Sequence, residues 1–113
     1  KYVINESFSN DSLKEIFMNK KIYFNNLYDY YSMLFTDKQR EYYEDYCFKD
    51  LSLAEIAENN NVSRNAVHGQ IKIVEEKLEF YEEVLGLYKK SVEIRKIINN
   101  IDPDVKKRIE ELI

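Results

Sequence analysis

Apolar side chains recur at alternating steps of three and four residues between Ile71 and Val92, and this spacing strongly constrains the fold. It places one apolar stripe along a helix of about three heptads. The stripe consists of Ile71, Val74, Leu78, Tyr81, Leu85, Tyr88 and Val92. The chain of 113 residues holds only 2 Gly and 1 Pro, which favours long helices over turn-rich sheets. We therefore predict an all-α fold with a long helix over residues 64–99, either continuous or broken near Gly86.

Hydroxyl and carboxylate side chains indicate where the other helices begin. Three pairs have the spacing of capping boxes: Ser12 with Glu15, Thr36 with Gln39, and Ser52 with Glu55. Asp102 precedes the proline of a further helix start. The helices predicted from such starts and from the periodicity between them cover residues 12–19, 20–35, 37–48, 53–59 and 103–113. We predict a single helical domain over residues 21–113, preceded by an arm over residues 1–20 that contains the first short helix.

Residues 52–73, SLAEIAENNNVSRNAVHGQIKI, have the pattern of a helix-turn-helix. Three asparagines separate the two helices, and asparagine tolerates the left-handed conformation that a tight turn requires. Small Ala57 and Ala66 allow the two helices to cross closely. Ser63 is the predicted cap of the second helix.

A helical wheel of the second helix separates a packing side from a polar side. Ala66, Val67, Gln70, Ile71, Val74 and Leu78 fall on one half. The opposite face carries the candidate nucleic-acid-binding residues, which together with the cap are Ser63, Arg64, Asn65, His68 and Lys72. Arginine can bind guanine or phosphate, asparagine can pair with adenine, and lysine neutralises a phosphate. The free N–H groups at the start of this helix favour a phosphate as well.

Glutamates limit how far such a contact can extend along the helix. Glu75 and Glu79 fall on the face of Arg64 and Lys72, one and two turns further on, where they would repel phosphates. Only the first two turns are expected to approach nucleic acid, with two or three phosphate contacts and a salt-sensitive affinity. The alternative is that the motif is a scaffold whose polar face is simply solvated.

The tyrosine-rich segment and the single cysteine have structural interpretations that we favour. Tyr30 and Tyr31 belong to an aromatic helix face, which is expected to line the core with hydroxyl groups at its edge, although such a face can also bind a partner. Cys47 lies among aromatic residues and far in sequence from His68, so a buried, inert thiol is expected.

Composition narrows the classes of function. The formal net charge is -4, so a nucleic-acid contact must rest on a local patch. The chain contains no apolar run long enough to span a bilayer, and its lone cysteine suits the cytoplasm, which is the expected compartment. No phosphate-binding glycine loop, catalytic triad or metal-ligand spacing is present. We therefore expect no enzymatic activity, no catalytic residue, no cofactor, no metal and no membrane partner.

Three stretches resemble the YlxM-like family of small helix-turn-helix proteins. They are LFTDKQREYYEDY (34–46), DLSLAEIA (50–57) and VSRNAV followed by IK (62–72), and the resemblance extends from about residue 22 to about residue 113. It implies a helix-turn-helix bundle similar to region four of sigma factors, with a long C-terminal helix or a helical hairpin. It also implies a link to the signal recognition particle, with its RNA or its GTPase as partner and DNA as the older interpretation of the motif.

The sequence is therefore consistent with two classes of function. The leading one is a non-enzymatic nucleic-acid-binding or regulatory protein associated with the signal recognition particle. The alternative is a protein-interaction module that uses the helix-turn-helix only as scaffold. In that case the apolar stripe from Ile71 to Val92 folds back on the tyrosine-rich helices, pairs with a second copy or docks on a larger protein, and a homodimer is one expected outcome.

Overall fold

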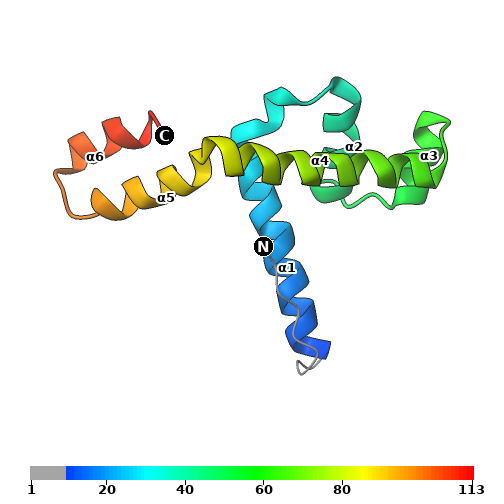
Figure 1. Ribbon diagram of the computed structural model, residues 1–113, viewed down its shortest axis with the longest axis horizontal. Helices are drawn as coiled ribbons and strands as arrows, with labels where there is room; N and C mark the ends of the chain where they lie inside the picture. Colours follow the sequence, from blue (N-terminus) through cyan, green and yellow to red (C-terminus); the bar gives the residue numbers. More distant parts are fainter. Residues whose placement is uncertain (1–9) are drawn as a thin grey trace.

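The computed structural model describes the backbone of residues 10–113 and the side chains of residues 19–113. Every regular element within this part of the chain is a helix, as predicted (Figure 1). The elements are α1 (Asn10–Tyr31), the 3-10 turn η1 (Ser32–Leu34), α2 (Asp37–Cys47), α3 (Leu53–Asn60), α4 (Arg64–Leu85), α5 (Leu87–Ile97) and α6 (Pro103–Glu110). None of the helices described is both long enough and apolar enough to cross a bilayer.

The first helix differs from the prediction. Residues 12–19 and 20–35 were expected as two helices, but α1 runs unbroken from Asn10 to Tyr31 and passes through the expected boundary near residue 20. No proline or glycine lies in this stretch to interrupt it. The expected cap of Ser12 with Glu15 lies outside the described side chains, and the segment before Asn10 lies outside the described residues.

The long helix is broken, which was one of the two predicted alternatives. Gly86 adopts a left-handed conformation with φ of 62°, ends α4 and begins α5. Glycine adopts this conformation without the steric cost that a Cβ would bring. Leu85 belongs to the predicted stripe, but because the chain turns there its side chain is 43% exposed. Helix α5 then ends at Ile97. Helix α6 ends at Glu110, three residues earlier than predicted.

The core lies where α1, α2 and α3 pack on the first half of α4. It consists of Phe24, Leu27, Tyr28, Tyr31, Phe35, Tyr42, Tyr43, Leu53, Ile56, Ala57, Val67, Ile71, Val74 and Leu78. The apolar stripe of α4 therefore folds back on the tyrosine-rich helices over its first half, as one of the predicted alternatives required. The rings of Tyr28 and Tyr43 stack at a centroid distance of 4.5 Å.

Hydroxyl groups at the edge of the core are hydrogen-bonded, which confirms that the tyrosine face is core lining. Tyr28 donates to Glu44 at 2.6 Å, Tyr31 to Glu82 at 2.7 Å and Tyr43 to Asn25 at 2.8 Å. Buried polar groups are costly unless they are paired in this way. The hydroxyl groups thus hold α1 to both α2 and α4.

Alkaline unfolding is an expected consequence of these buried phenols. Burial, followed by the hydrogen bond to Glu82, raises the pKa of Tyr31 to about 12, and burial also raises the pKa of Tyr28 and Tyr43 above the usual range. Tyrosines of the unfolded chain ionise near pH ~10, so the stability from these groups is complete below that pH and is lost as the pH rises toward 12. We expect helicity and phenolate absorbance to change together between pH ~10 and ~12. Phenolate absorbance that rises with helicity intact would contradict this.

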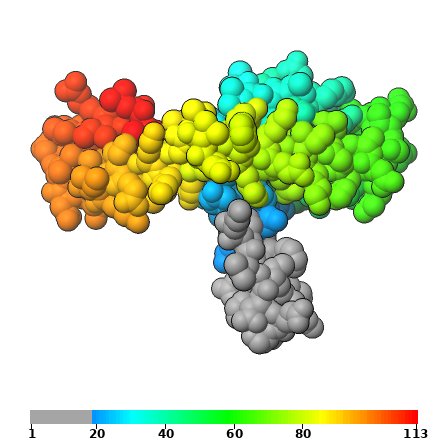
Figure 2. All heavy atoms as spheres, viewed as in Figure 1, coloured from blue at the N-terminus to red at the C-terminus, as the bar shows by residue number. Residues whose placement is uncertain are grey.

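The molecule is elongated rather than spherical. Its radius of gyration is 17.2 Å, whereas a compact domain of this length has about 13 Å. Helix α1 crosses α4 and its amino-terminal half extends away from the bundle (Figure 1). Helices α5 and α6 form a hairpin at one end of the molecule, while α3 lies at the opposite end, as the space-filling view also shows (Figure 2).

Candidate nucleic-acid interface

Helices α3 and α4 form the predicted helix-turn-helix. The capping box of Ser52 and Glu55 begins α3, with both reciprocal hydrogen bonds present. Asn61 ends α3 in the left-handed conformation, with φ of 54°. Ser63 then caps α4, because its Oγ accepts the N–H of Ala66 at 3.0 Å. The sequence pattern predicted each of these local features.

One side of α4 is anchored in the core. Val67, Val74 and Leu78 are completely buried, and Ile71 is 5% exposed. Ala66 and Gln70 were also expected on the packing side, but Ala66 is exposed and Gln70 is half-buried. They sit at the margin of this face, where α2 approaches: the Gln39 side chain donates to the Gln70 amide oxygen at 3.3 Å.

The candidate contact residues lie together on the exposed start of α4. All of them are exposed: Ser63, Arg64, Asn65, His68 and Lys72. Within the part of the chain that the structure describes, neither Arg64 nor Lys72 forms an ion pair with a carboxylate. The first N–H groups of an α-helix have no intrahelical partner, so the start of α4 offers both hydrogen-bond donors and the positive end of the helix dipole.

Glu75 does not face outward as the wheel suggested. It is half-buried, and this burial raises the pKa of its carboxyl group, while the positive charges of Lys20 and Lys72 lower it. Lys20 belongs to α1, which the sequence could not place beside α4. The carboxylate is therefore balanced by cations on two helices, and the repulsion expected from it is reduced. Glu79 remains exposed.

Other lysines lie near the candidate contact residues of α4, and the sequence pattern did not indicate them. Lys20 and Lys21 of α1 line a hollow together with Glu75 and Cys47. Lys38, at the start of α2, donates to the Asn60 side chain at the end of α3 at 3.0 Å, but its charge is paired with Glu41 at 3.2 Å. The lysines are visible in the sequence, but their proximity to α4 arises only from how α1 and α2 cross it.

Cys47 has the properties of an inert thiol. It is half-buried between α1, α2 and α4, and this burial raises the pKa of its thiol, although a hydrogen bond with Tyr43 and the charge of Lys21 oppose the shift. A raised pKa keeps the thiol protonated at neutral pH, and the protonated form is a poor nucleophile.

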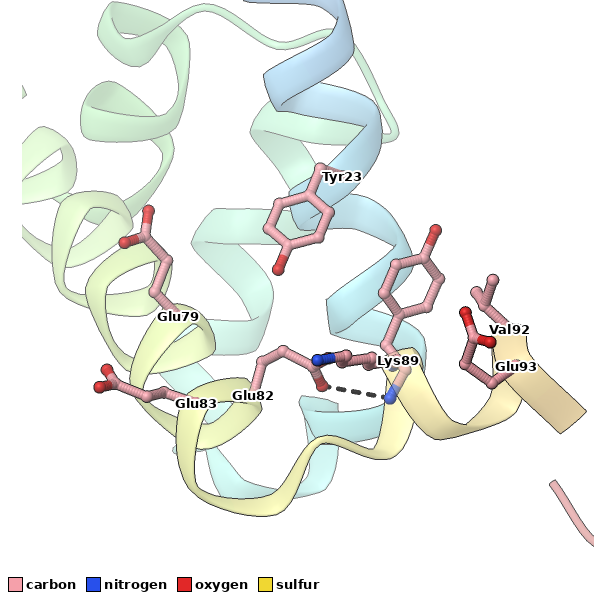
Figure 3. Close-up of a pocket in the computed structure, with 8 residues that line it drawn as sticks. Tyr23, Glu79, Glu82, Glu83, Lys89, Val92 and Glu93 are labelled. Atoms are coloured by element: carbon pink, nitrogen blue, oxygen red, sulfur yellow. Dashed lines mark hydrogen bonds between the residues drawn. The ribbon is translucent and has the colours of Figure 1, made fainter. Parts of the chain in front are cut away.

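A second hollow, of about 600 Å³, lies where α1, α4 and α5 meet (Figure 3). Its lining residues are Tyr23, Glu79, Glu82, Glu83, Tyr88, Lys89, Val92 and Glu93. Glu82 has a structural role, because its carboxylate accepts the backbone N–H groups of Tyr88 and Lys89 at 3.1 and 3.0 Å. The carboxylates make this hollow unsuitable for phosphate, so the two ends of α4 differ in charge.

Known proteins are similar in sequence to this chain over most of its length. The model of the YlxM / p13-like helix-turn-helix protein family matches residues 18–113. A UPF0122 protein of Caldanaerobacter subterraneus is 52% identical over 75 residues, which cover 66% of this chain and 64% of that protein, just under two thirds of its length.

Two further relatives align over more of their own length. A UPF0122 protein of Thermoanaerobacter sp. is 43% identical over 98 residues, covering 76% of this chain and 84% of that protein. A UPF0122 protein of Geobacillus kaustophilus is 44% identical over 91 residues, covering 80% and 83%. With the helix-turn-helix formed by α3 and α4, these similarities identify the chain as a member of the YlxM / p13-like helix-turn-helix family.

Proposed function

We propose that this protein is a non-enzymatic, regulatory nucleic-acid-binding protein that contacts its target through the start of α4. One observation carries the proposal: Arg64 and Lys72 are exposed together while Val67 and Ile71 anchor the opposite side of the same helix in the core. A helix that is held from behind presents its polar side chains without having to reorganise on binding.

Each candidate residue has a distinct role in this proposal. Arg64 binds a guanine edge or a phosphate, and Lys72 neutralises a phosphate about two turns further along. Asn65 pairs with adenine where the helix enters a major groove. His68 lies between them, and Ser63 orders the first turn so that its N–H groups face a phosphate. Lys20 and Lys21 add positive charge from α1.

The target follows from the family resemblance as a further step of the proposal. That resemblance implies the signal recognition particle, through its RNA or its GTPase, beside DNA. If RNA is bound, the contact falls on a loop, a bulge or the backbone, because the deep major groove of A-form RNA excludes a helix. If DNA is bound, the first two turns of α4 fit the major groove.

A salt titration tests this proposal. Binding of the full chain to duplex DNA, to the particle RNA and to the GTPase is measured by fluorescence anisotropy at increasing salt. For two or three phosphate contacts, we expect the logarithm of the association constant to fall against the logarithm of salt concentration with a slope of about -2 to -3. Binding to neither nucleic acid at low salt, or an affinity that does not change with salt, contradicts the proposal. Binding to the GTPase alone would assign the protein to the interaction class.

A protein-interaction function is the second candidate, and a specific observation favours it. Large apolar side chains remain exposed away from the helix-turn-helix, including Phe80 at 59%, Val84 at 64% and Ile97 at 76%. They lie beyond the middle of α4 and on α5, so this function and nucleic-acid binding use different surfaces and are compatible.

A further inference from the structure

The α5–α6 hairpin stands out from the bundle at one end of the molecule (Figure 2). Its base is fixed to α1, because the Tyr30 hydroxyl donates to Ser91 of α5 at 2.7 Å.

Apolar side chains are concentrated on this end of the molecule. We use the name arm surface for the exposed residues Phe80, Val84, Leu87, Ile97, Val105 and Leu112. Leu112, just after α6, is 85% exposed, and Ile97, the last residue of α5, is 76% exposed. Several large apolar side chains exposed at one end of a molecule favour an interaction site there. The predicted apolar stripe is not that site, because Ile71, Val74 and Leu78 are already buried within the monomer.

Charge is distributed unevenly along the arm surface. Residues 75–85 contain five glutamates and one lysine, and the exposed Glu76, Glu79 and Glu83 flank Phe80 on α4. Residues 87–113 contain seven lysines or arginines and five acidic residues. The hairpin thus has a surplus of two positive charges, and the two ion pairs within it, Glu110 with Arg95 at 3.3 Å and Glu93 with Lys96 at 3.4 Å, leave that surplus unchanged. One part of the arm surface is thus acidic and the other basic.

We infer that the arm surface binds a second copy of this chain, with the acidic end of α4 in one copy against the basic α5–α6 hairpin of the other, antiparallel about a two-fold axis. Such an interface is self-complementary, because each copy supplies one acidic and one basic half. A parallel arrangement would instead place like charges opposite each other, which disfavours it. The charge pattern therefore selects both the occupant and its direction.

The pairing rests on the arm surface alone and does not depend on the proposed nucleic-acid binding. It nevertheless changes what that binding achieves. The start of α4 lies at the far end of the molecule from the hairpin (Figure 1), so both copies keep their candidate contact residues exposed. A dimer would therefore have twice as many candidate phosphate contacts as a monomer.

Sedimentation velocity of the full chain over a range of concentrations tests the inference. We expect a reversible dimer whose dissociation constant rises at least about tenfold in the double variant Phe80→Glu/Val84→Glu. Both positions are exposed, so circular dichroism is expected to stay unchanged. Met33→Glu is the control, since Met33 is 80% exposed but belongs to η1 and not to the arm surface, and it should dimerise as the wild type does.

A charge exchange tests the antiparallel arrangement. Glu83→Lys and Lys107→Glu are each expected to weaken the dimer, and their combination is expected to recover part of the affinity. A wild-type chain that is monomeric at every concentration overturns the inference, as does a dimer that the Phe80→Glu/Val84→Glu variant leaves unchanged. A dimer weakened by neither charge variant overturns the antiparallel arrangement. Nucleic-acid affinity of a monomeric variant, measured separately, distinguishes these outcomes from failure of the proposed function.

Discussion

The double variant Arg64→Glu/Lys72→Glu is expected to bind nucleic acid about 100-fold more weakly than the wild type, because each lost contact costs roughly 1–3 kcal/mol. Both side chains are exposed and neither forms an ion pair within the described residues, so their reversal breaks no ion pair, although it removes the positive charge that Lys72 places near Glu75. Fluorescence anisotropy at low salt measures the affinity. Circular dichroism should show unchanged helicity.

The matched control is Lys49→Glu/Lys77→Glu, which changes the net charge by the same amount. Both lysines are exposed, but Lys49 follows α2 and Lys77 lies on another side of α4. Lys49 also pairs with Asp45 at 3.3 Å, so circular dichroism must show that the control variant keeps its helicity. If the effect came from overall charge, the two double variants would bind equally weakly. Equal affinity of the Arg64→Glu/Lys72→Glu variant and the wild type would place the nucleic-acid contact on another surface.

The second large effect is expected on stability. Leu78→Ala should lower the free energy of unfolding by about 3 kcal/mol, because it removes a completely buried side chain and leaves a cavity that the surrounding helices fill only in part. Leu78 packs in the cluster that joins α4 to the other helices of the core. Urea denaturation followed by circular dichroism measures the change.

Leu34→Ala removes the same atoms from an exposed position and serves as the control. Leu34 is 54% exposed, and its replacement should change the free energy of unfolding by less than about 0.5 kcal/mol. A similar loss in both variants would mean that the core is not centred on α4. A loss below about 1 kcal/mol in Leu78→Ala would contradict the burial of this side chain.

Local signals in the sequence determined most of the fold correctly. The capping boxes placed the starts of α2 and α3 at Thr36 and Ser52, and the apolar spacing placed the anchored side of α4. Such signals depend only on neighbours within one or two turns of a helix. The continuity of α1 through residue 20 was missed, although this stretch contains no proline or glycine that would end a helix there.

The sequence predicted that the candidate residues share an exposed face of α4, but it did not predict which residues of other helices lie beside them. A wheel orders the side chains around one helix, and it gave Arg64, His68 and Lys72 a common face. It carries no information about where another helix crosses, so it could not place Lys20 beside Glu75 or predict the partial burial of that carboxylate. Long-range crossings of this kind depend on how the whole core packs.

The bend at Gly86 is held by side chains and not by a loop. Glu82 binds the first N–H groups of α5 and accepts the Tyr31 hydroxyl hydrogen, while the Tyr31 oxygen accepts the N–H of Leu87 at 3.1 Å. Helix α1 therefore sets the angle at which the hairpin leaves α4. If two copies pair as inferred above, the distance between the starts of their α4 helices depends on the angle of this bend. If each α4 also binds nucleic acid as proposed, a substitution of Tyr31 would change the distance between the two bound sites without altering any residue that contacts them.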